Sequence, residues 1–196
     1  MKTNKSWLGV VAMLPFLAQA DVGLSSARGP GCLLRSERVQ PAEGHPFTLY
    51  KLQVERVEFQ FVPPPAWTVK YDPNKRTLTL LAMDLDGGVS VALDLGETVE
   101  SEATDPEQVK AGILERYKGA RGLREYRRPI AGVECAGYEF ERPIDKNLLG
   151  SFRVIQVVFP GGRAEFEMKS SSRKFSDFDP LFSAFLGSFR IQHAAR

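Results

Sequence analysis

Residues 176–189 read SDFDPLFSAFLGSF, and this stretch decides the fold. Its apolar side chains recur at the three- and four-residue spacing that lines one side of an α-helix, and they are Phe178, Leu181, Phe182, Phe185, Leu186 and Phe189. Asp177 or Asp179 can cap the start, and Pro180 suits the first turn, where its missing N–H leaves no bond unmade. So many large apolar side chains on one helix need a broad apolar surface opposite them, which predicts a β-sheet built from the upstream chain.

The upstream chain shows the alternation of apolar and polar residues that a sheet requires. Alternation starts at Phe47, and the tri-proline segment, residues 63–65, ends the first strands because proline donates no hydrogen bond to a ladder. The clearest hairpin runs over residues 81–95 and turns at Asp86-Gly87-Gly88. Residues 151–159 are nearly all apolar, which is typical of a central strand covered on both faces.

A second helix is predicted in the middle of the chain. Residues 104–107 read TDPE, a cap followed by a first helical turn, and Gly119 or Gly122 would end the helix. Residues 21–46 are rich in Gly, Pro, Ser and charge, so they are predicted to form an irregular arm. Residues 47–192 would then form a single domain, with the C-terminal helix packed on its sheet.

The first 20 residues have the pattern of a secretory signal peptide. Lys2 and Lys5 precede an apolar run, and Ala18-Gln19-Ala20 supplies a small-x-small cleavage site. The run is shorter than the about 20 apolar residues that span a membrane, and no later segment qualifies as a transmembrane segment. We expect an exported product that begins at Asp21 and resides in the periplasm or outside the cell.

The charges of the exported chain balance, because removing Lys2 and Lys5 reduces the 26 basic residues to 24, against 24 acidic ones. This neutrality argues against nucleic acid or an anionic membrane as a partner. The signs are nevertheless segregated, since residues 77–109 hold eight carboxylates and no Lys or Arg, and residues 110–128 are mostly basic. This basic block is either a surface for an anionic partner or simply solvated, and its candidate residues are Arg116, Lys118, Arg121, Arg124, Arg127 and Arg128.

Two interpretations stay open for Cys32 and Cys135, the only two cysteines. Export would allow them to form a disulfide, which would close a loop of about 100 residues and contribute about 4–5 kcal/mol in the chain-entropy model. Alternatively, Cys135 is buried within a strand and Cys32 is free in a loop.

No catalytic or cofactor motif stands out from the rest of the sequence. His45 and His193, the two histidines, do not combine with the cysteines in the spacing of zinc ligands. No Gly-x-Ser-x-Gly elbow surrounds a serine, and a glycosidase-type acid pair cannot be picked from eight carboxylates without geometry. We therefore expect no cofactor, no metal and no enzymatic activity, with a hydrolase as the remaining enzyme alternative.

Two stretches resemble the PsbP/Mog/DcrB-like superfamily. Residues 57–63, VEFQFVP, leading to Trp67, are similar to its opening strand, and residues 182–189, FSAFLGSF, to its closing helix. The order of elements between them is similar as well. The resemblance implies an α+β fold, an α/β/α sandwich with a mainly antiparallel sheet, and non-catalytic members. No binding residue of the family matches a position in this chain, so the resemblance implies the fold without a site.

We expect an exported, non-catalytic envelope protein that binds another protein or an apolar segment through a sheet or groove surface. The leader, the aromatic core and the missing catalytic motifs motivate this expectation. The alternative is a carrier of a lipid or another small hydrophobic ligand, held in a cavity between the helix of residues 178–189 and the sheet.

Overall fold

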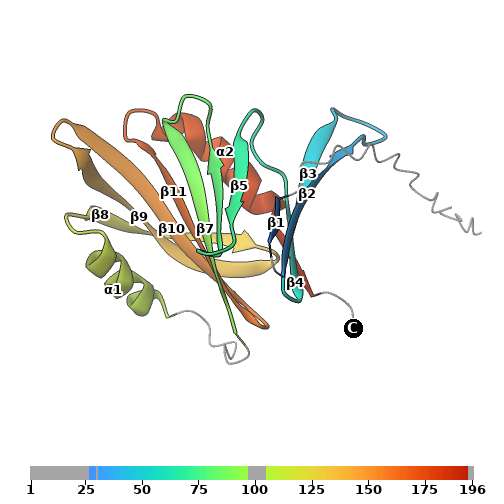
Figure 1. Cartoon of the computed structure of the whole chain (residues 1–196). Helices are drawn as coiled ribbons and strands as arrows, with labels where there is room; N and C mark the ends of the chain where they lie inside the picture. Colours follow the sequence, from blue (N-terminus) through green and yellow to red (C-terminus); the bar gives the residue numbers. More distant parts are fainter. Residues whose placement is uncertain (1–26, 30, 97–104, 194–196) are drawn as a thin grey trace, which may run out of the picture.

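The structure is a computed structural model that describes residues 27–29, 31–96 and 105–193 (Figure 1). These residues form twelve strands and two helices, and the strands build two sheets in which every pair is antiparallel. The predicted signal peptide, residues 1–20, lies outside the described residues. The antiparallel arrangement expected from the sequence is confirmed.

The smaller sheet has five strands in the order β1-β2-β3-β4-β12. The strands are β1 (Ala27–Gly29), β2 (Cys32–Val39), β3 (Phe47–Val54), β4 (Val57–Phe61) and β12 (Arg190–His193). The irregular arm predicted over residues 21–46 is therefore wrong for β2. Its charges suggested a loop, but they are paired across the sheet, Glu37 with Lys51 at 3.0 Å and Arg35 with Glu58 at 3.3 Å.

The larger sheet has seven strands in the order β5-β6-β7-β11-β10-β9-β8. The strands are β5 (Thr68–Asp72), β6 (Thr77–Leu81), β7 (Gly87–Leu95), β8 (Arg121–Ile130), β9 (Val133–Asp145), β10 (Leu148–Phe159) and β11 (Gly162–Ser171). The apolar run at residues 151–159 lies in β10, between β9 and β11, which confirms the predicted central strand. The predicted hairpin is also present, as the β6–β7 pair, but its turn was placed too late, because residues 82–86 connect the strands and Gly87 and Gly88 belong to β7.

The two helices lie on opposite faces of the larger sheet (Figure 1). Helix α1 (Pro106–Arg116) buries Ile113 against a cluster that includes Val154, whereas Ile155 belongs to the main core under helix α2 (Phe175–Ser188). Adjacent residues of a strand face opposite ways, so β10 supplies both clusters. The predicted cap of α1 is confirmed, because the Asp105 side chain accepts a hydrogen bond from the Glu107 N–H at 3.0 Å.

Helix α2 begins at Phe175, earlier than predicted, so Pro180 lies inside the helix and not in its first turn. Lys174 occupies the N-cap position without a side-chain hydrogen bond, and neither Asp177 nor Asp179 caps the helix. The predicted buried face is largely present, since Phe178, Phe182, Phe185 and Leu186 are buried.

The expected α/β/α sandwich is wrong, because the described residues form two sheets and two helices, so that a single helix and not a helical layer lies on each face of the larger sheet. Helix α2 contacts β4 of the smaller sheet and β7, β8 and β11 of the larger one. The ring of Phe185 lies 5.8 Å from Phe61 on β4 and 6.2 Å from Phe166 on β11, centroid to centroid. The apolar surface that the helix needs therefore comes from two sheets, which also contact each other directly through Phe59 and Phe159.

The two sheets are linked near the end of β3. Arg76, in the turn after β5, pairs with Glu55, in the turn after β3, at 2.8 Å. The other end of β3 begins at Phe47, where the tri-proline segment, Trp67 and α2 also meet. The candidate site lies at this second end.

Candidate functional site

A groove with a volume of about 530 Å³ lies where β3 begins. Its walls are the start of β3, the tri-proline segment with its neighbours, and one side of α2. The lining residues are Pro46, Phe47, Thr48, Tyr50, Val62, Pro63, Pro64, Pro65, Ala66, Trp67, Leu181, Ala184 and Ser188. None of them is charged, although 26% of the whole chain is. A concave, uncharged and largely apolar surface is typical of a ligand site.

The groove exists because β4 pairs with only part of β3. β3 pairs with β2 along its whole length, from Phe47 to Val54, but its ladder with β4 stops at the pair Tyr50 and Phe61. Continuing that register would place Pro63 opposite Thr48, and proline has no N–H to donate. The tri-proline segment therefore leaves the sheet, and the groove opens between it and residues 47–49.

Ser188, in the last turn of α2, holds the departing chain. The backbone N–H of Val62 donates to the Ser188 hydroxyl at 3.0 Å, and that hydroxyl donates to the Phe185 carbonyl at 2.7 Å. Val62, the first residue beyond β4, is thus bound to the helix and not to β3. This contact fixes the position of the tri-proline wall relative to the wall that α2 forms.

Trp67 forms the wall of the groove next to α2. Its ring meets Phe178 and Phe182 edge-on, with centroids 5.8 and 6.1 Å apart, so the helix orients it. Its backbone N–H donates to the Pro64 carbonyl at 3.2 Å, which closes the turn at the end of the tri-proline segment. On the opposite wall Phe47 is 38% exposed, an unusual degree for a phenylalanine in a strand.

The sequence identified the terminal helix, the tri-proline segment and Trp67 separately, and the structure brings them together. The residues that sequence reasoning missed are Phe47, Thr48 and Ser188. Their place in the groove depends on where the pairing of β3 with β4 ends. The tri-proline segment was the sequence feature that could have indicated this end.

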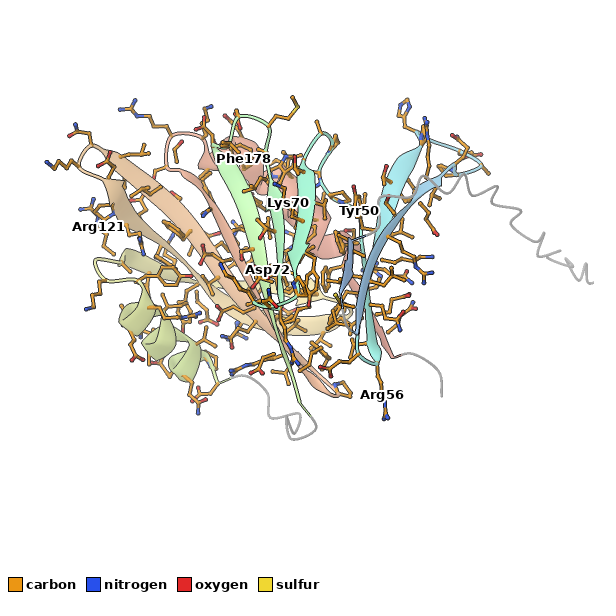
Figure 2. The ribbon with its side chains drawn as sticks, in the orientation of Figure 1. Tyr50, Arg56, Lys70, Asp72, Arg121 and Phe178 are labelled. Atoms are coloured by element: carbon orange, nitrogen blue, oxygen red, sulfur yellow. The ribbon has the colours of Figure 1, made fainter. Side chains whose placement is uncertain are left out.

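The six residues of the basic block are divided by the structure. Arg116 ends α1, Lys118 follows it, and the other four lie on β8, the edge strand of the larger sheet. Arg127 and Arg128 are adjacent on β8 and so point to opposite faces. Arg124 pairs with Glu139 at 3.3 Å and Arg127 with Glu125 at 2.6 Å. Figure 2 shows Arg121 on the side of the molecule away from Tyr50 and the groove.

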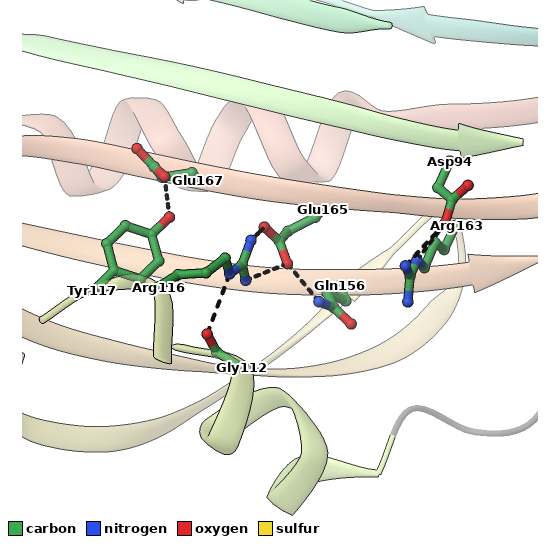
Figure 3. A network of polar contacts seen from close by, with 8 residues as sticks. All are labelled: Asp94, Gly112, Arg116, Tyr117, Gln156, Arg163, Glu165 and Glu167. Carbon is green, nitrogen blue, oxygen red and sulfur yellow. Dashed lines mark hydrogen bonds and ion pairs between the residues drawn. The ribbon is translucent and has the colours of Figure 1, made fainter. Parts of the chain in front are cut away.

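Arg116 belongs to a polar network between α1 and the larger sheet (Figure 3). It donates to both carboxylate oxygens of Glu165, which also accepts from Gln156 at 2.5 Å. Burial raises the pKa of Glu165, but these hydrogen bonds outweigh it and hold the pKa below its usual value. Beside it, burial and a hydrogen bond to Glu167 raise the pKa of Tyr117. The network attaches the helix to the sheet.

A second buried ionic cluster fixes the start of α2. Arg153 on β10 is only 4% exposed, and its guanidinium carbon lies 4.0 Å from the ring centre of Tyr126 and 5.2 Å from that of Phe175. It pairs with Glu139 and, at 2.6 Å, with Asp179. Burial alone would lower the pKa of Arg153, but the hydrogen bonds to the two carboxylates outweigh burial and raise the pKa above its usual value. The guanidinium therefore keeps its charge.

The disulfide interpretation is wrong, because Cys32 and Cys135, both within the described residues, are free. Cys32 opens β2 in the smaller sheet, whereas Cys135 lies on β9 in the larger one. The alternative is right for Cys135, which is buried and donates to the Val133 carbonyl at 3.2 Å. Burial raises the pKa of its thiol to about 11. Cys32 begins a strand and does not lie in a loop.

The acidic block, residues 77–109, does not gather into one site in the part of the chain that the structure describes. Asp84 and Asp86 both pair with Lys174, and Asp94 pairs with Arg163 at 2.9 Å. Residues 97–104 lie outside the described residues. Across the described ranges, no three His, Cys, Asp or Glu side chains are grouped to hold a metal ion. No described helix has the length and apolar character to cross a membrane.

No protein-family model matches this chain, and no curated protein matches it. Among solved structures, the chain is similar to the crystal structure of LpqN involved in cell envelope biogenesis of Mycobacterium tuberculosis. The TM-score is 0.42 and the sequence identity 9%, over 81% of this chain and 91% of that chain. The likeness is distant, so the function proposed below rests on the groove.

Proposed function

We propose that this protein is an exported, non-catalytic binding protein whose groove receives an apolar segment of another protein. The observation that carries the proposal is the lining, thirteen residues of which none is charged. Burying a charge without a partner is costly, so such a lining favours an uncharged, apolar occupant.

The residue types in the groove support a role in recognition. Phe47, Tyr50 and Trp67 contribute aromatic rings to the lining, and aromatic side chains are enriched at the centres of protein interfaces. Trp67 and Tyr50 are anchored by rings of the core, since Tyr50 stacks on Phe61 at 5.7 Å. Anchored rings lose little freedom on binding, which favours affinity.

A lipid or another small hydrophobic ligand is the second candidate. The volume of about 530 Å³ lies within the range of about 300–1,000 Å³ that is common for small-molecule sites. The groove borders α2, as the carrier alternative requires. No lining residue can neutralise an ionised headgroup, so this ligand would also be uncharged.

Membership of the PsbP/Mog/DcrB-like superfamily stays a prediction, as does export. The two stretches that carry the resemblance, residues 57–67 and 182–189, both contribute to the groove. This convergence supports a binding role without assigning a partner.

The test uses Trp67 as a reporter. In the full chain carrying W7F, Trp67 is the only tryptophan, because the sequence has two. We expect its emission to shift to shorter wavelength when 1-decanol or a capped, uncharged apolar heptapeptide displaces water from the groove. The variant A184D places a charge on the groove wall and should abolish the shift.

The matched control is A111D, which makes the same change at an exposed alanine of α1, outside the groove. It should bind like the parent chain. Absence of a shift with both probes, or equal binding by the two variants, would contradict the proposed function.

A further inference from the structure

We propose that the occupant of the groove is an extended polypeptide segment that pairs with residues 47–49 of β3 and adds a strand to the smaller sheet. This inference rests on the proposed function and specifies its ligand, a peptide backbone in the β conformation.

Within the part of the chain that the structure describes, residues 47–49 have a sheet neighbour on one side only. Their pairing with β2 is complete, Phe47 opposite Val39 and Thr48 opposite Arg38, while the β4 ladder begins at Tyr50. In an antiparallel sheet the N–H and C=O of one residue point to the same neighbour, and successive residues alternate. At least one N–H and C=O pair of this three-residue stretch therefore points into the groove.

The segment that follows β4 cannot complete this edge. The segment that would follow β4 in register consists of Val62 and the prolines, and both backbone groups of Val62 face Ser188, on the side away from β3. The prolines carry no N–H at all. The groove is thus a ladder position that none of the described strands fills, open at the surface, where Phe47 and Thr48 are exposed. Such an edge is a ready template for strand addition.

The charge of the lining favours a peptide over an ionic lipid. The backbone of a peptide segment carries no net charge, and its amide groups can form hydrogen bonds with those of β3. An ionised carboxylate or phosphate headgroup would find no cation among the lining side chains. The match in charge and the match in hydrogen bonding therefore point to the same occupant.

The side-chain pattern of the occupant also follows from the sheet. Leu52 and Val54 of β3 are buried, so its even-numbered residues face the core and α2. A strand added beside β3 would direct every second side chain to that same face, toward Leu181 and Trp67. The segment should therefore alternate apolar residues with residues of any polarity.

The experiment compares three peptides with 1-decanol on the W7F chain. The first is the capped heptapeptide Ser-Val-Ser-Val-Ser-Val-Ser, and the other two carry N-methyl groups on either the serine or the valine amides. Trp67 emission reports binding, and hydrogen exchange reports the amides of residues 47–49. We expect the first peptide to bind and to slow exchange in this stretch about tenfold, as one added hydrogen bond would.

One methylated peptide should bind about tenfold more weakly than the other, because only alternate amides of a strand point to β3. Equal binding of both methylated peptides would overturn strand addition while leaving the proposed binding function intact. A response to 1-decanol but to no peptide would also overturn it, in favour of a small ligand. No response to either probe would reject the proposed function itself.

Discussion

The backbone N–H of Val62 donates to the side-chain hydroxyl of Ser188 at 3.0 Å, which joins the end of β4 to the last turn of α2. These residues are 126 positions apart in the sequence. The Ser188 hydroxyl also donates to the Val62 carbonyl at 3.3 Å, so both backbone groups of Val62 face α2, on the side away from β3. One hydroxyl group therefore attaches the segment after β4 to the wall that α2 forms.

Replacing Ser188 by alanine should reduce stability by about 1 kcal/mol, because the Val62 N–H loses its acceptor. The midpoint of urea unfolding measures the change. Ser183 is half-buried on the same helix, and S183A should change stability by less than about 0.5 kcal/mol. Equal losses in the two variants would show that the hydroxyl of Ser188 has no special role.

The triple variant P63T/P64V/P65T should close the groove. It restores backbone N–H groups, so that β4 can extend along residues 47–49. Amide exchange in that stretch should then be slow without any ligand, and 1-decanol should no longer shift Trp67 emission. The control P73T changes an exposed proline in the turn after β5, outside the groove, and should bind normally. Normal binding by the triple variant would refute our account of why the groove is open.

Removing one ion-pair partner of the buried Arg153 should lower the free energy of unfolding far more than removing the partner of an exposed arginine. We expect E139Q to lower stability by about 3 kcal/mol, because the buried guanidinium keeps only Asp179. The control E125Q breaks an exposed pair with Arg127 and should cost less than about 1 kcal/mol. Thermal or urea unfolding of both variants measures whether E139Q loses more stability than E125Q.

Glu165 should make the protein sensitive to acid. Its pKa is lower in the folded state than the ordinary value of 4.5, so its contribution is complete above that pH. The contribution falls as the pH drops through the lower folded-state pKa. The variant E165Q should therefore lose less stability than the parent chain between neutral pH and the acid range. Parallel stability curves for the two proteins would rule this out.

Both thiols should be free in the purified protein. Alkylation in denaturant without reductant should add two groups, as measured by intact mass. In the folded protein at neutral pH, Cys135 should react slowly, because burial raises its pKa to about 11 and the thiolate is the nucleophile. A chain that gains groups only after reduction would disprove the free-thiol structure.

Local patterns in the sequence predicted the elements well. The spacing of the phenylalanines gave the buried face of α2, and Asp105 marked the start of α1. The nearly continuous apolar run in residues 151–159 predicted the central strand β10. Each of these features is determined by neighbours along the chain, which a sequence displays directly.

Relations between distant segments could not be predicted in the same way. β2 looked irregular because its charges find partners only once β3 and β4 lie beside it. The groove depends on the register of β3 with β4 and on Ser188, whose partner is Val62. The disulfide interpretation failed for the same reason, since whether Cys32 and Cys135 meet depends on how their two sheets pack, and the structure leaves both free.

β8 has a single neighbour, β9, and its charged side chains and Pro129 occupy the free margin of the larger sheet. Two copies that met along this margin would bring arginine against arginine, and the proline would leave a gap in the hydrogen bonding. The four arginines and the proline of β8 therefore make this edge a poor place for a second copy to add a strand, in contrast to the uncharged groove beside residues 47–49.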